Sequence, residues 1–331
     1  MDTFNYTDFI LQWHITHRCN LRCKHCYQED YSAFEDFDQA LRILDQYCEL
    51  LKAYGCSGQL NITGGEPLTH PHLFELLRLA RSRRIKTGVL TNGTLIGEWE
   101  AKKLKACGVD YVQVSLDGIK KSHEAIRGPG SFDRALSGIC ALKSKGIFTS
   151  VSFTAQRGNY KDLKKLANLC EDIGADKLWF DRVIIPAAED SENLTLSLDS
   201  FRQLCNTAAR LNRNGKVFCG RALQFIPCKK KLIYHCSAGH NLLVVLANGD
   251  VMPCRRLPLV IGNVKQTNLL TLHRTSPVMK NLRAVGIPEG CKQCSYAELC
   301  RGGPKCVAYA KTGRFDIPDP DCFLLPDKKN N

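Results

Sequence analysis

Three cysteines near the start of the chain constrain its fold and chemistry more than any other feature of the sequence. Cys19, Cys23 and Cys26 are separated by three and by two residues, and they come shortly after an apolar run at residues 9–16. Three thiolates at this spacing can ligate three corners of a cubane iron–sulfur cluster, whereas a structural zinc or a fully ligated cluster takes four protein ligands. The odd count therefore predicts one open metal corner, where a small molecule can bind and react. Half of a zinc site, or a disulfide with one cysteine left over, is the alternative interpretation.

The composition supports metal binding as the role of the cysteines. The chain has 331 residues, enough for one large or two modest domains, and 18 of them are cysteine. The sequence carries neither a secretory signal pattern nor an apolar run long enough to span a membrane. We therefore expect a cytoplasmic protein whose cysteines bind metal rather than form disulfides. The formal charge is +13, but no base-stacking motif accompanies it, so nucleic acid is not favoured as a partner. A docking face for an acidic peptide is the functional alternative to a solvated basic surface.

Residues 9 to about 185 alternate between strand-like and helical patterns. The expected strands lie at residues 10–16, 59–62, 87–90, 111–116, 148–154 and 178–184. Apolar stripes with helical spacing lie between them, for example at residues 40–51, 73–80 and 163–173. Six strand–helix repeats predict a parallel sheet with right-handed crossovers. Because six strands are too few to close an eight-stranded barrel, we expect an α/β fold with a partial (β/α)6 TIM-like barrel, open on one side.

The sequence predicts three regions along the chain. Residues 1–185 form the expected barrel, and residues 186–218 form a connector with one helix. Residues 219–331 are dense in cysteine, glycine and proline and sparse in helical patterns. We expect this last region to be a small cysteine-rich domain with little hydrophobic core, which needs metal clusters to hold it together.

Several polar motifs fall at the ends of the expected strands, which is where a TIM-like barrel places its functional groups. Gly64 and Gly65 follow the second strand and would let the backbone approach a ligand closely, while Glu66, just before Pro67, can hold an ammonium group. The other candidates at strand ends, or shortly after one, are Asn92, Ser115 and Arg127. An arginine suits a carboxylate in bidentate geometry, although a surface salt bridge is an equal interpretation of Arg127.

The cysteine spacing, the aromatic Tyr27 directly after Cys26 and the Gly-Gly-Glu-Pro motif after the second strand together resemble the signature of radical S-adenosylmethionine (radical SAM) enzymes. The resemblance implies that the open iron chelates the amino and carboxylate groups of SAM. It also implies that the motif at residues 64–67 holds the SAM amino group, and that Ser115 and Arg127 hold the carboxylate and the ribose. Tyr27 would lie near the adenine, and Asn92 would line the floor of the site.

The chemistry implied by this resemblance is reductive cleavage of SAM. One electron enters the sulfonium, methionine leaves, and a 5′-deoxyadenosyl radical takes a hydrogen atom from an unreactive C–H bond. The protein must exclude water and hold the target hydrogen close to the radical. An electron donor such as flavodoxin or ferredoxin is the expected redox partner.

The cysteines of the C-terminal region resemble a SPASM domain, which follows the radical SAM core in many peptide-modifying enzymes. Their order is Cys236, Cys254, Cys291, Cys294, Cys300, Cys306 and Cys322, with five residues instead of the usual three before Cys306. By analogy, auxiliary cluster I uses Cys228, Cys236, Cys254 and Cys306, and auxiliary cluster II uses Cys291, Cys294, Cys300 and Cys322. Cys219 is the rival of Cys228. The resemblance thus implies three [4Fe–4S] clusters, and two zinc sites are the alternative for the C-terminal region.

The resemblance covers almost the whole chain but is less specific about the substrate. Sulfatase maturases carry an aspartate directly after the cysteine equivalent to Cys254, whereas this chain has Arg255 and Arg256, so sulfatase maturation is disfavoured. The chain begins almost at the first strand, without room for a leader-recognition domain. We therefore expect a separate protein, or the basic surface itself, to present a leader-bearing peptide.

The expected function is the maturation of a ribosomally synthesised peptide by thioether or carbon–carbon cross-linking. Three alternatives stay open. The first is a small-molecule enzyme of tetrapyrrole or quinone-cofactor biosynthesis. The second is a peptide epimerase, for which Cys219 is a weak hydrogen-donor candidate. The third is a non-catalytic iron–sulfur or zinc scaffold.

Overall fold

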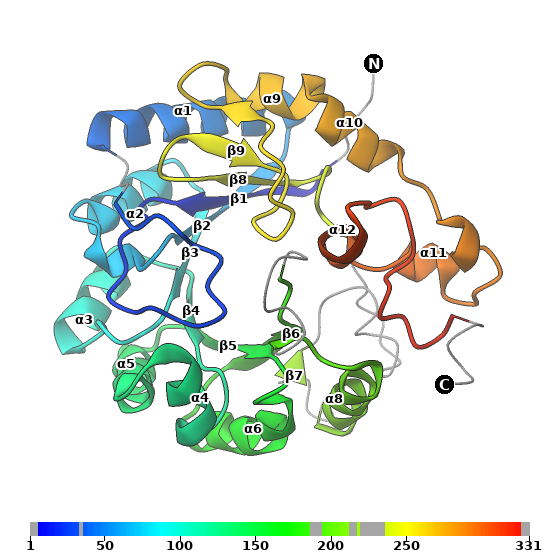
Figure 1. Ribbon diagram of the computed structural model, residues 1–331. Helices are drawn as coiled ribbons and strands as arrows, with labels where there is room; N and C mark the ends of the chain where they lie inside the picture. Colours follow the sequence, from blue (N-terminus) through cyan, green and yellow to red (C-terminus); the bar gives the residue numbers. More distant parts are fainter. Residues whose placement is uncertain (1–5, 33–35, 186–193, 212–216, 219–235, 326–331) are drawn as a thin grey trace.

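A ten-stranded sheet forms the centre of the molecule, and helices cover its outer face (Figure 1). The computed structural model describes residues 6–32, 36–185, 194–211, 217–218 and 236–325. The strand order is β10-β9-β8-β1-β2-β3-β4-β5-β6-β7. All neighbours from β8 to β7 pair in parallel, while β8 with β9 and β9 with β10 pair antiparallel.

The six predicted strands are all present, each within two residues of its expected bounds. They are β1 (Asp8–His14), β2 (Ser57–Thr63), β3 (Lys86–Thr91), β4 (Tyr111–Ser115), β5 (Thr149–Ala155) and β6 (Lys177–Arg182). In Figure 1 they curve into an arc that stays open beside α12 (Lys305–Thr312). The predicted partial (β/α)6 TIM-like barrel is confirmed.

The barrel helices lie where the apolar stripes predict them. They are α1 (Phe37–Tyr54), α2 (Leu73–Ser82), α3 (Glu98–Ala106), α4 (Lys120–Arg127), α5 (Ser131–Ser144) and α6 (Leu163–Asp172), and α8 (Leu198–Leu211) is the predicted connector helix. Helix α1 shows how the sequence determines where a helix begins and ends. The Asp36 carboxylate accepts a hydrogen bond from the Gln39 amide at 2.8 Å, and Gly55 ends α1 in a left-handed conformation (φ 60°).

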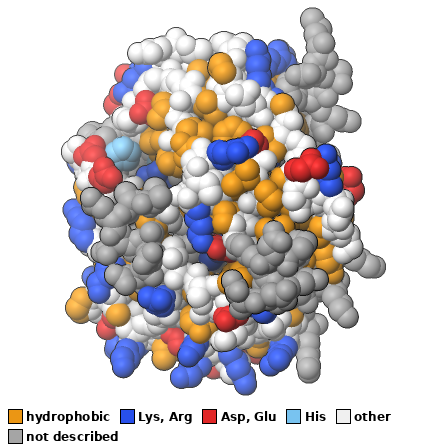
Figure 2. Space-filling view, turned by 45° about the vertical axis from the view of Figure 1, so that its right-hand side comes forward, with side chains coloured by type: hydrophobic (Ala, Val, Ile, Leu, Met, Phe, Trp, Pro, Cys, Tyr) orange, Lys and Arg blue, Asp and Glu red, His pale blue; other side chains and the backbone are white. Residues whose placement is uncertain are grey.

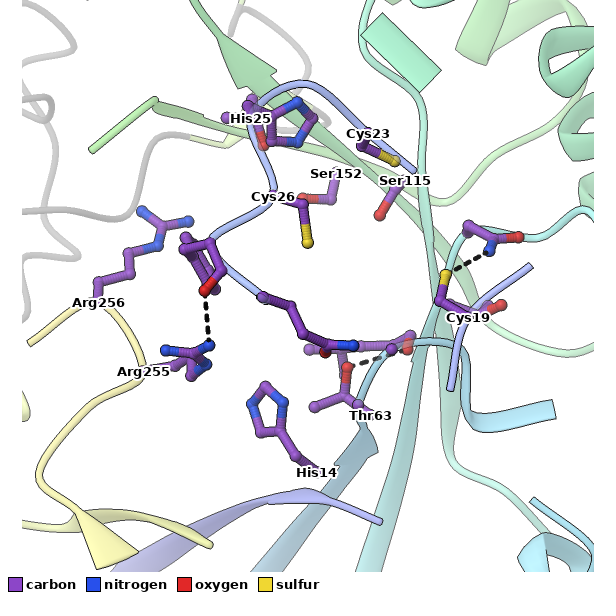
Figure 3. Close-up of a pocket in the computed structure, with 18 of the residues that line it drawn as sticks. His14, Cys19, Cys23, His25, Cys26, Thr63, Ser115, Ser152, Arg255 and Arg256 are labelled. Atoms are coloured by element: carbon purple, nitrogen blue, oxygen red, sulfur yellow. Dashed lines mark hydrogen bonds between the residues drawn. The ribbon is translucent and has the colours of Figure 1, made fainter. Parts of the chain in front are cut away.

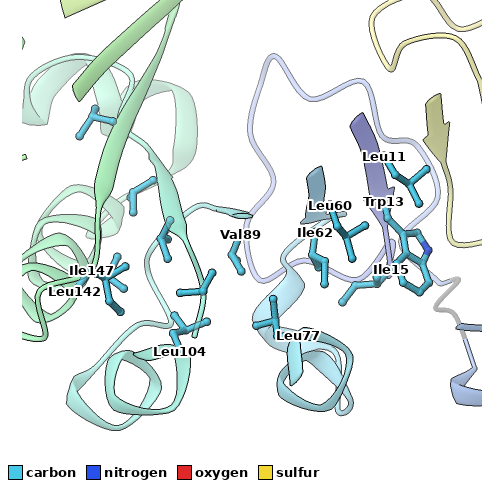
Figure 4. Close-up of a cluster of buried hydrophobic side chains, with 14 of the residues drawn as sticks. Leu11, Trp13, Ile15, Leu60, Ile62, Leu77, Val89, Leu104, Leu142 and Ile147 are labelled. Carbon is cyan, nitrogen blue, oxygen red and sulfur yellow. The ribbon is translucent and has the colours of Figure 1, made fainter. Parts of the chain in front are cut away.

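The hydrophobic core fills the layer between the outer face of the sheet and these helices. Alternate residues of β1 and β2, such as Leu11, Trp13, Leu60 and Ile62, point into this layer, where they join Leu77 of α2 (Figure 4). The residues between them face the barrel interior, which is polar: Gln12, His14, Gln113 and Ser152 line a cavity there. The alternation thus leaves the inside of the barrel free for a ligand.

The region after residue 219 continues the barrel sheet instead of forming a separate layer. Its strands are β8 (Leu242–Val245), β9 (Asp250–Met252) and β10 (Gly262–Asn263), while β7 (Val217–Phe218) lies at the opposite edge. Strand β8 pairs with β1 in the register Ile10 to Leu242.

The C-terminal region also contributes helices and core residues. Its helices are α9 (Leu269–Thr275), α10 (Pro277–Ala284), α11 (Ala297–Cys300) and α12, and α9 packs against α1. The expectation of little core is wrong for this region, because Leu243, Val245, Leu269 and Met279 are buried in the main core. Cys300 and Cys306 lie in the short helices α11 and α12.

On the face seen in Figure 2, Lys and Arg side chains are scattered over both the edge and the middle, with Asp and Glu among them. Within the part of the chain that the structure describes, no helix combines the length and apolar character that crossing a membrane requires.

Candidate active site

A cavity of about 370 Å³ opens at the carboxyl ends of the barrel strands (Figure 3). Its walls come from the loop after β1, the ends of β2 to β6 and the turn after β9. The cavity therefore lies between the barrel and the C-terminal region. Among the described residues that line it, none is an aspartate or a glutamate.

The thiols of Cys19, Cys23 and Cys26 all line this cavity, as the sequence predicts. Hydrogen bonds hold the loop: the Cys26 amide donates to the Cys23 carbonyl at 3.0 Å, and the Lys24 amide to the Ile126 carbonyl at 3.0 Å. Burial is the main cause that raises the pKa of Cys19, and it raises the pKa of Cys23 to about 11. The Cys26 thiol raises both pKa values further, so the three thiols lie within electrostatic reach of one another.

This donor set fits a cluster with one open corner. The thiols are soft ligands, and iron binding would displace their protons whatever their pKa in the metal-free protein. Nothing else on the cysteine loop competes as a fourth thiolate, because the loop contains only these three cysteines.

The two glycines of the 64–67 motif are needed because the cysteine loop lies against them. A β-carbon at Gly65 would lie 2.3 Å from the Arg18 carbonyl oxygen, and one at Gly64 would lie 2.2 Å from the Thr16 carbonyl oxygen. The Gly65 amide instead donates to the Thr16 carbonyl at 2.7 Å. Both glycines line the cavity, so this turn fixes the cysteine loop to the end of β2 and leaves its backbone open to a ligand.

Glu66 is not among the residues that line the cavity, and its expected role in holding an ammonium group stays a prediction. Its carboxylate is fully buried and accepts hydrogen bonds from the Thr91 hydroxyl (2.7 Å), the Asn92 amide (2.8 Å) and the Leu68 amide (3.2 Å). Burial raises the pKa of Glu66 to about 7 against the effect of these donors. Glu66 therefore ties the end of β2 to the end of β3.

Pro67 also lies away from the cavity. It is buried at the first position of a short 3₁₀ helix, Pro67–Thr69, where the lack of an amide hydrogen costs nothing. Its expected place in the SAM-binding motif stays a prediction, and in the structure it starts this turn.

Asn92, Ser115 and Arg127 line the cavity, as expected. The Asn92 side-chain amide donates to the Asn20 side chain at 2.9 Å and lies 3.9 Å from the Cys19 sulfur. Ser115 is the last residue of β4, beside the cysteine loop (Figure 3).

Arg127 forms a buried ion pair, so its interpretation as a surface salt bridge is wrong. Its Nε donates to Asp117 Oδ2 at 2.6 Å, and the two side chains are 9% and 0% exposed. One terminal nitrogen lies 3.8 Å from the Cys23 sulfur. Burial opposes the ionisation of Asp117, but Arg127 and His25 outweigh it and hold the pKa of Asp117 below its usual value.

Tyr27 lies at the junction between the cysteine loop and the C-terminal region. The Arg255 guanidinium stands 4.5 Å from the centre of the Tyr27 ring, and its Nη2 donates to the Tyr27 carbonyl at 3.2 Å. Arg255 thus brings the turn after β9 against the loop that carries the three thiols.

The sequence does not predict several of the lining residues, and His14, His25, Arg182 and Arg256 are among them. His25 directly precedes Cys26, so its place inside the cysteine motif was an available signal. His14 follows from the β1 alternation, because it lies two residues after the inward-facing Gln12. Burial, followed by the charge of Arg255, lowers the pKa of His14 to about 3, so its imidazole is neutral.

Arg182 and Arg256 connect the end of β6 to the C-terminal region. Arg182 pairs with Asp319 and, at 2.9 Å, with Asp321, and these carboxylates lie just before Cys322. Arg256 pairs with Asp181. No local sequence pattern relates residues so far apart, and only the fold brings them together.

The first expected auxiliary set is partly described. Cys236, Cys254 and Cys306 belong to one apolar cluster with Leu257 and Val307. Arg301, Gly302 and Gly303 have positive φ angles of 48°, 82° and 88°, and this turn accommodates the longer spacing before Cys306. Cys228 and its rival Cys219 lie outside the described residues.

The second expected auxiliary set is gathered in one place. Burial, followed by the Cys322 and Cys294 thiols, raises the pKa of Cys291 to about 11. Burial, followed by the Cys322 thiol, raises that of Cys300 to about 12. Among the described residues, no three His, Cys, Asp or Glu side chains converge on the position of a single metal ion.

Two family models match the chain. Residues 13–170 match the radical SAM superfamily, and residues 236–295 match SPASM, an iron-sulfur cluster-binding domain. The first match contains all three cavity cysteines, and the second contains Cys236, Cys254, Cys291 and Cys294.

Three curated relatives match nearly the full chain. A pre-heme d1 synthase from Dinoroseobacter shibae is 31% identical over 95% of this chain and 86% of its own length. An AdoMet-dependent heme synthase from Methanosarcina barkeri is 27% identical over 97% of both chains. A PqqA peptide cyclase from Granulibacter bethesdensis is 25% identical over 94% of this chain and 86% of its own length.

The fold also occurs in solved structures. The structure described as native anSMEcpe with bound AdoMet and Cp18Cys peptide superimposes with a TM-score of 0.78. The match covers 97% of this chain and 95% of that one at 21% identity, so it shows the fold alone.

Proposed function

This chain is a radical SAM enzyme with a SPASM domain, and from that premise we propose that it removes a hydrogen atom from a C–H bond of a substrate bound between the barrel and the C-terminal region. The observation that carries the proposal is the cavity that three thiols, a glycine turn and a buried arginine line together. The absence of described carboxylates from its lining favours an anionic or carboxylate-bearing occupant.

In this proposal Cys19, Cys23 and Cys26 hold a [4Fe–4S] cluster, which supplies the electron that cleaves SAM into methionine and a 5′-deoxyadenosyl radical. The backbone of Gly64 and Gly65 and the side chains of Asn92 and Ser115 then orient SAM against the cysteine loop.

Arg127 has its direction set before SAM binds, because Asp117 holds its Nε while a terminal nitrogen stays near Cys23. A carboxylate of SAM at that nitrogen would not require the side chain to reorganise. Tyr27 forms the edge of the site beside the adenine in this proposal.

We assign the other cysteines to two auxiliary [4Fe–4S] clusters. Cys236, Cys254 and Cys306, with Cys228, would hold cluster I, and Cys291, Cys294, Cys300 and Cys322 would hold cluster II. Interleaved ligands tie distant loops together, which suits a segment with little helix or strand of its own. An electron donor such as flavodoxin or ferredoxin would reduce the protein.

The first candidate substrate is a ribosomally synthesised peptide, cross-linked through a thioether or a carbon–carbon bond. Similarity to a PqqA peptide cyclase over most of both chains supports it. A separate leader-binding protein would be the further partner. The epimerase alternative depends on Cys219, which lies outside the described residues.

The second candidate substrate is a tetrapyrrole. The relatives at 31% and 27% identity, which are a pre-heme d1 synthase and a heme synthase, favour it. Both candidates use the same SAM chemistry, so they differ only in what occupies the substrate side of the cavity.

Iron and sulfide analysis after anaerobic purification tests the cluster assignment. Three four-iron clusters predict roughly twelve irons per chain, and a Cys19/Cys23/Cys26→Ala triple variant should hold roughly eight. Formation of 5′-deoxyadenosine from SAM under strong reductant should occur in the wild type and be lost in this variant. Intact SAM in the fully loaded wild type would contradict the enzyme assignment.

The substrate is tested separately. A peptide encoded by a neighbouring gene is co-expressed with the enzyme. Its mass should show the loss of hydrogens that cross-linking causes. An unmodified peptide, together with turnover of an iron porphyrin, would move the assignment to the tetrapyrrole candidate.

A further inference from the structure

Four arginines line the cavity, and three of them are neutralised by aspartates. Arg127 pairs with Asp117, Arg182 with Asp319 and Asp321, and Arg256 with Asp181. Arg255 differs, because within the described ranges no carboxylate forms an ion pair with it. Since no described carboxylate lines the cavity, this positive charge has no counter-ion there.

The position of Arg255 is set by the protein itself. Its guanidinium stacks on the Tyr27 ring and uses Nη2 to bind the Tyr27 carbonyl, which fixes the plane of the group. A guanidinium has five N–H donors, and the one recorded hydrogen bond accounts for one of them. The side chain is therefore oriented, half-buried and still able to bind a planar anion in bidentate geometry.

Arg255 lies on the side of the cavity opposite Cys19, Cys23 and Ser115, and the expected SAM contact that it touches is Tyr27. In Figure 3, Cys19, Cys23 and Ser115 lie on one side, and Arg255 and Arg256 lie on the other, with Cys26 between them. His14 lies below Arg255 and adds a neutral imidazole to the same side. The carboxylate of SAM already has Arg127 beside the thiols in the proposed function, so the cation on the opposite side is left for the substrate.

We propose that Arg255 is a specificity-determining residue that binds a carboxylate of the substrate. This inference rests on the proposed function, because it requires the substrate to enter this cavity. It narrows the substrate class to acids, whose carboxylate is either an Asp or Glu side chain of a peptide or a propionate of a tetrapyrrole. An oriented, half-buried arginine discriminates against an analogue that lacks the charged partner, since the cation is then left unpaired.

Equilibrium dialysis against the cluster-loaded, SAM-bound full chain, without reductant, tests this inference. The probes are a short glutamate-rich peptide and its glutamine counterpart, and iron coproporphyrin III and its tetramethyl ester. We expect one acidic probe to bind at least tenfold more tightly than its neutral counterpart. The acidic probe that binds identifies the source of the carboxylate.

The variants assign this preference to one side chain. Arg255→Gln should weaken binding of the acidic probe at least tenfold. Arg255→Lys should lose less of this affinity, because it keeps the charge but not the bidentate geometry. Arg134→Gln is the matched control, since Arg134 is exposed on α5, where its Nε donates to the Gly130 carbonyl at 3.1 Å, and it does not line the cavity. It should bind like the wild type.

Four results would overturn the inference: equal binding of acidic and neutral probes, no binding of either acid, unchanged binding by Arg255→Gln, or an equal loss of SAM affinity in Arg255→Gln. If Arg255→Gln does not retain its iron, two results still test the inference. They are the difference in affinity between acidic and neutral probes for the wild type, and the affinity of Arg255→Lys for the acidic probe. Binding is measured without SAM cleavage. A wild type that prefers the acid but leaves SAM intact under reductant would therefore contradict the proposed function and not the carboxylate site.

Discussion

At the residue scale, two buried carboxylates, those of Glu66 and Asp117, position residues that line the cavity without lining it themselves. Glu66 does not line the cavity, yet two hydrogen bonds from Thr91 and Asn92 join it to the end of β3, and a third, from the Leu68 amide, fixes its own turn. Asp117 likewise orients Arg127 and accepts from the Thr154 amide at 2.8 Å. These buried carboxylates place the groups that would touch SAM, so substitutions behind the cavity should act as strongly as those within it.

Gly65→Ala should displace the cysteine loop, because the new β-carbon would lie 2.3 Å from the Arg18 carbonyl oxygen and 2.6 Å from that of His17. We expect at least a tenfold loss of SAM affinity and a loss of roughly four irons per chain. Gly158→Ala is the control, since nothing lies within 4 Å of its added β-carbon. Wild-type SAM affinity in Gly65→Ala would show that the loop adjusts without cost.

The buried imidazole of His273 should make the folded protein less stable in mild acid. Its ring is buried between the Tyr54 hydroxyl and the His240 carbonyl, both at 2.6 Å, and burial lowers its pKa to about 4. Below its ordinary pKa of about 6.5, the unfolded chain takes up a proton that the folded chain refuses. The free energy of unfolding should therefore fall as the pH drops from 6.5 to 4, by up to about 3 kcal/mol.

His273→Gln removes this titration while keeping a polar side chain. Urea unfolding at several pH values should show a shallower pH dependence in the variant than in the wild type. Parallel curves for the two proteins would mean that His273 does not contribute to the acid sensitivity.

At the scale of elements, the end of β6 is the main polar joint between the barrel and the cysteine-rich segment. Asp181 and Arg182 are consecutive residues of opposite charge, and both form ion pairs with the C-terminal region. Asp181 pairs with Arg256, and Arg182 pairs with Asp319 and Asp321. Cys322 comes directly after Asp321, so the last expected ligand of auxiliary cluster II depends on this joint. Breaking it should affect stability and cluster II together.

Asp319→Asn tests the joint. Both Asp319 and Arg182 are buried, and removing one partner leaves a buried charge less well paired, so we expect a loss of about 3 kcal/mol in the free energy of unfolding. Iron content should fall toward roughly eight per chain if cluster II is lost. Asp316→Asn is the control, because Asp316 pairs with Arg314 at the surface of the same segment.

The control should leave both the urea midpoint and the iron content unchanged. If the two variants behaved alike, the pairing of β6 with the C-terminal loop would be of no importance to the fold.

At the scale of the whole molecule, the barrel and the C-terminal region share one sheet, and part of the C-terminal region is buried in the main core. Strand β8 pairs with β1 over four residues, and Gln46 of α1 bonds both the Val264 carbonyl (3.2 Å) and the Leu269 amide (3.1 Å). The chain after residue 219 thus covers an edge of the barrel sheet that would otherwise be exposed. We infer that the two regions do not behave as independent folding units.

Thermal unfolding should accordingly show one transition. Far-UV circular dichroism, which follows the helices and the sheet, and visible absorbance, which follows the clusters, should change at the same temperature. An earlier loss of cluster absorbance with the helical signal intact would show that the C-terminal region unfolds by itself.

The grouping of Cys291, Cys294, Cys300 and Cys322 was implied by the resemblance to a SPASM domain. The sequence by itself determined the strands and helices of the barrel and the three thiols of the cavity. These features are local, since apolar periodicity and ligand spacing relate neighbouring residues. Only the tertiary structure decided the direction of Glu66, the pairing of β8 with β1 and the contact of Arg255 with Tyr27, which are 228 residues apart. No short-range pattern relates such partners, because burial and contacts between residues far apart in the sequence select them.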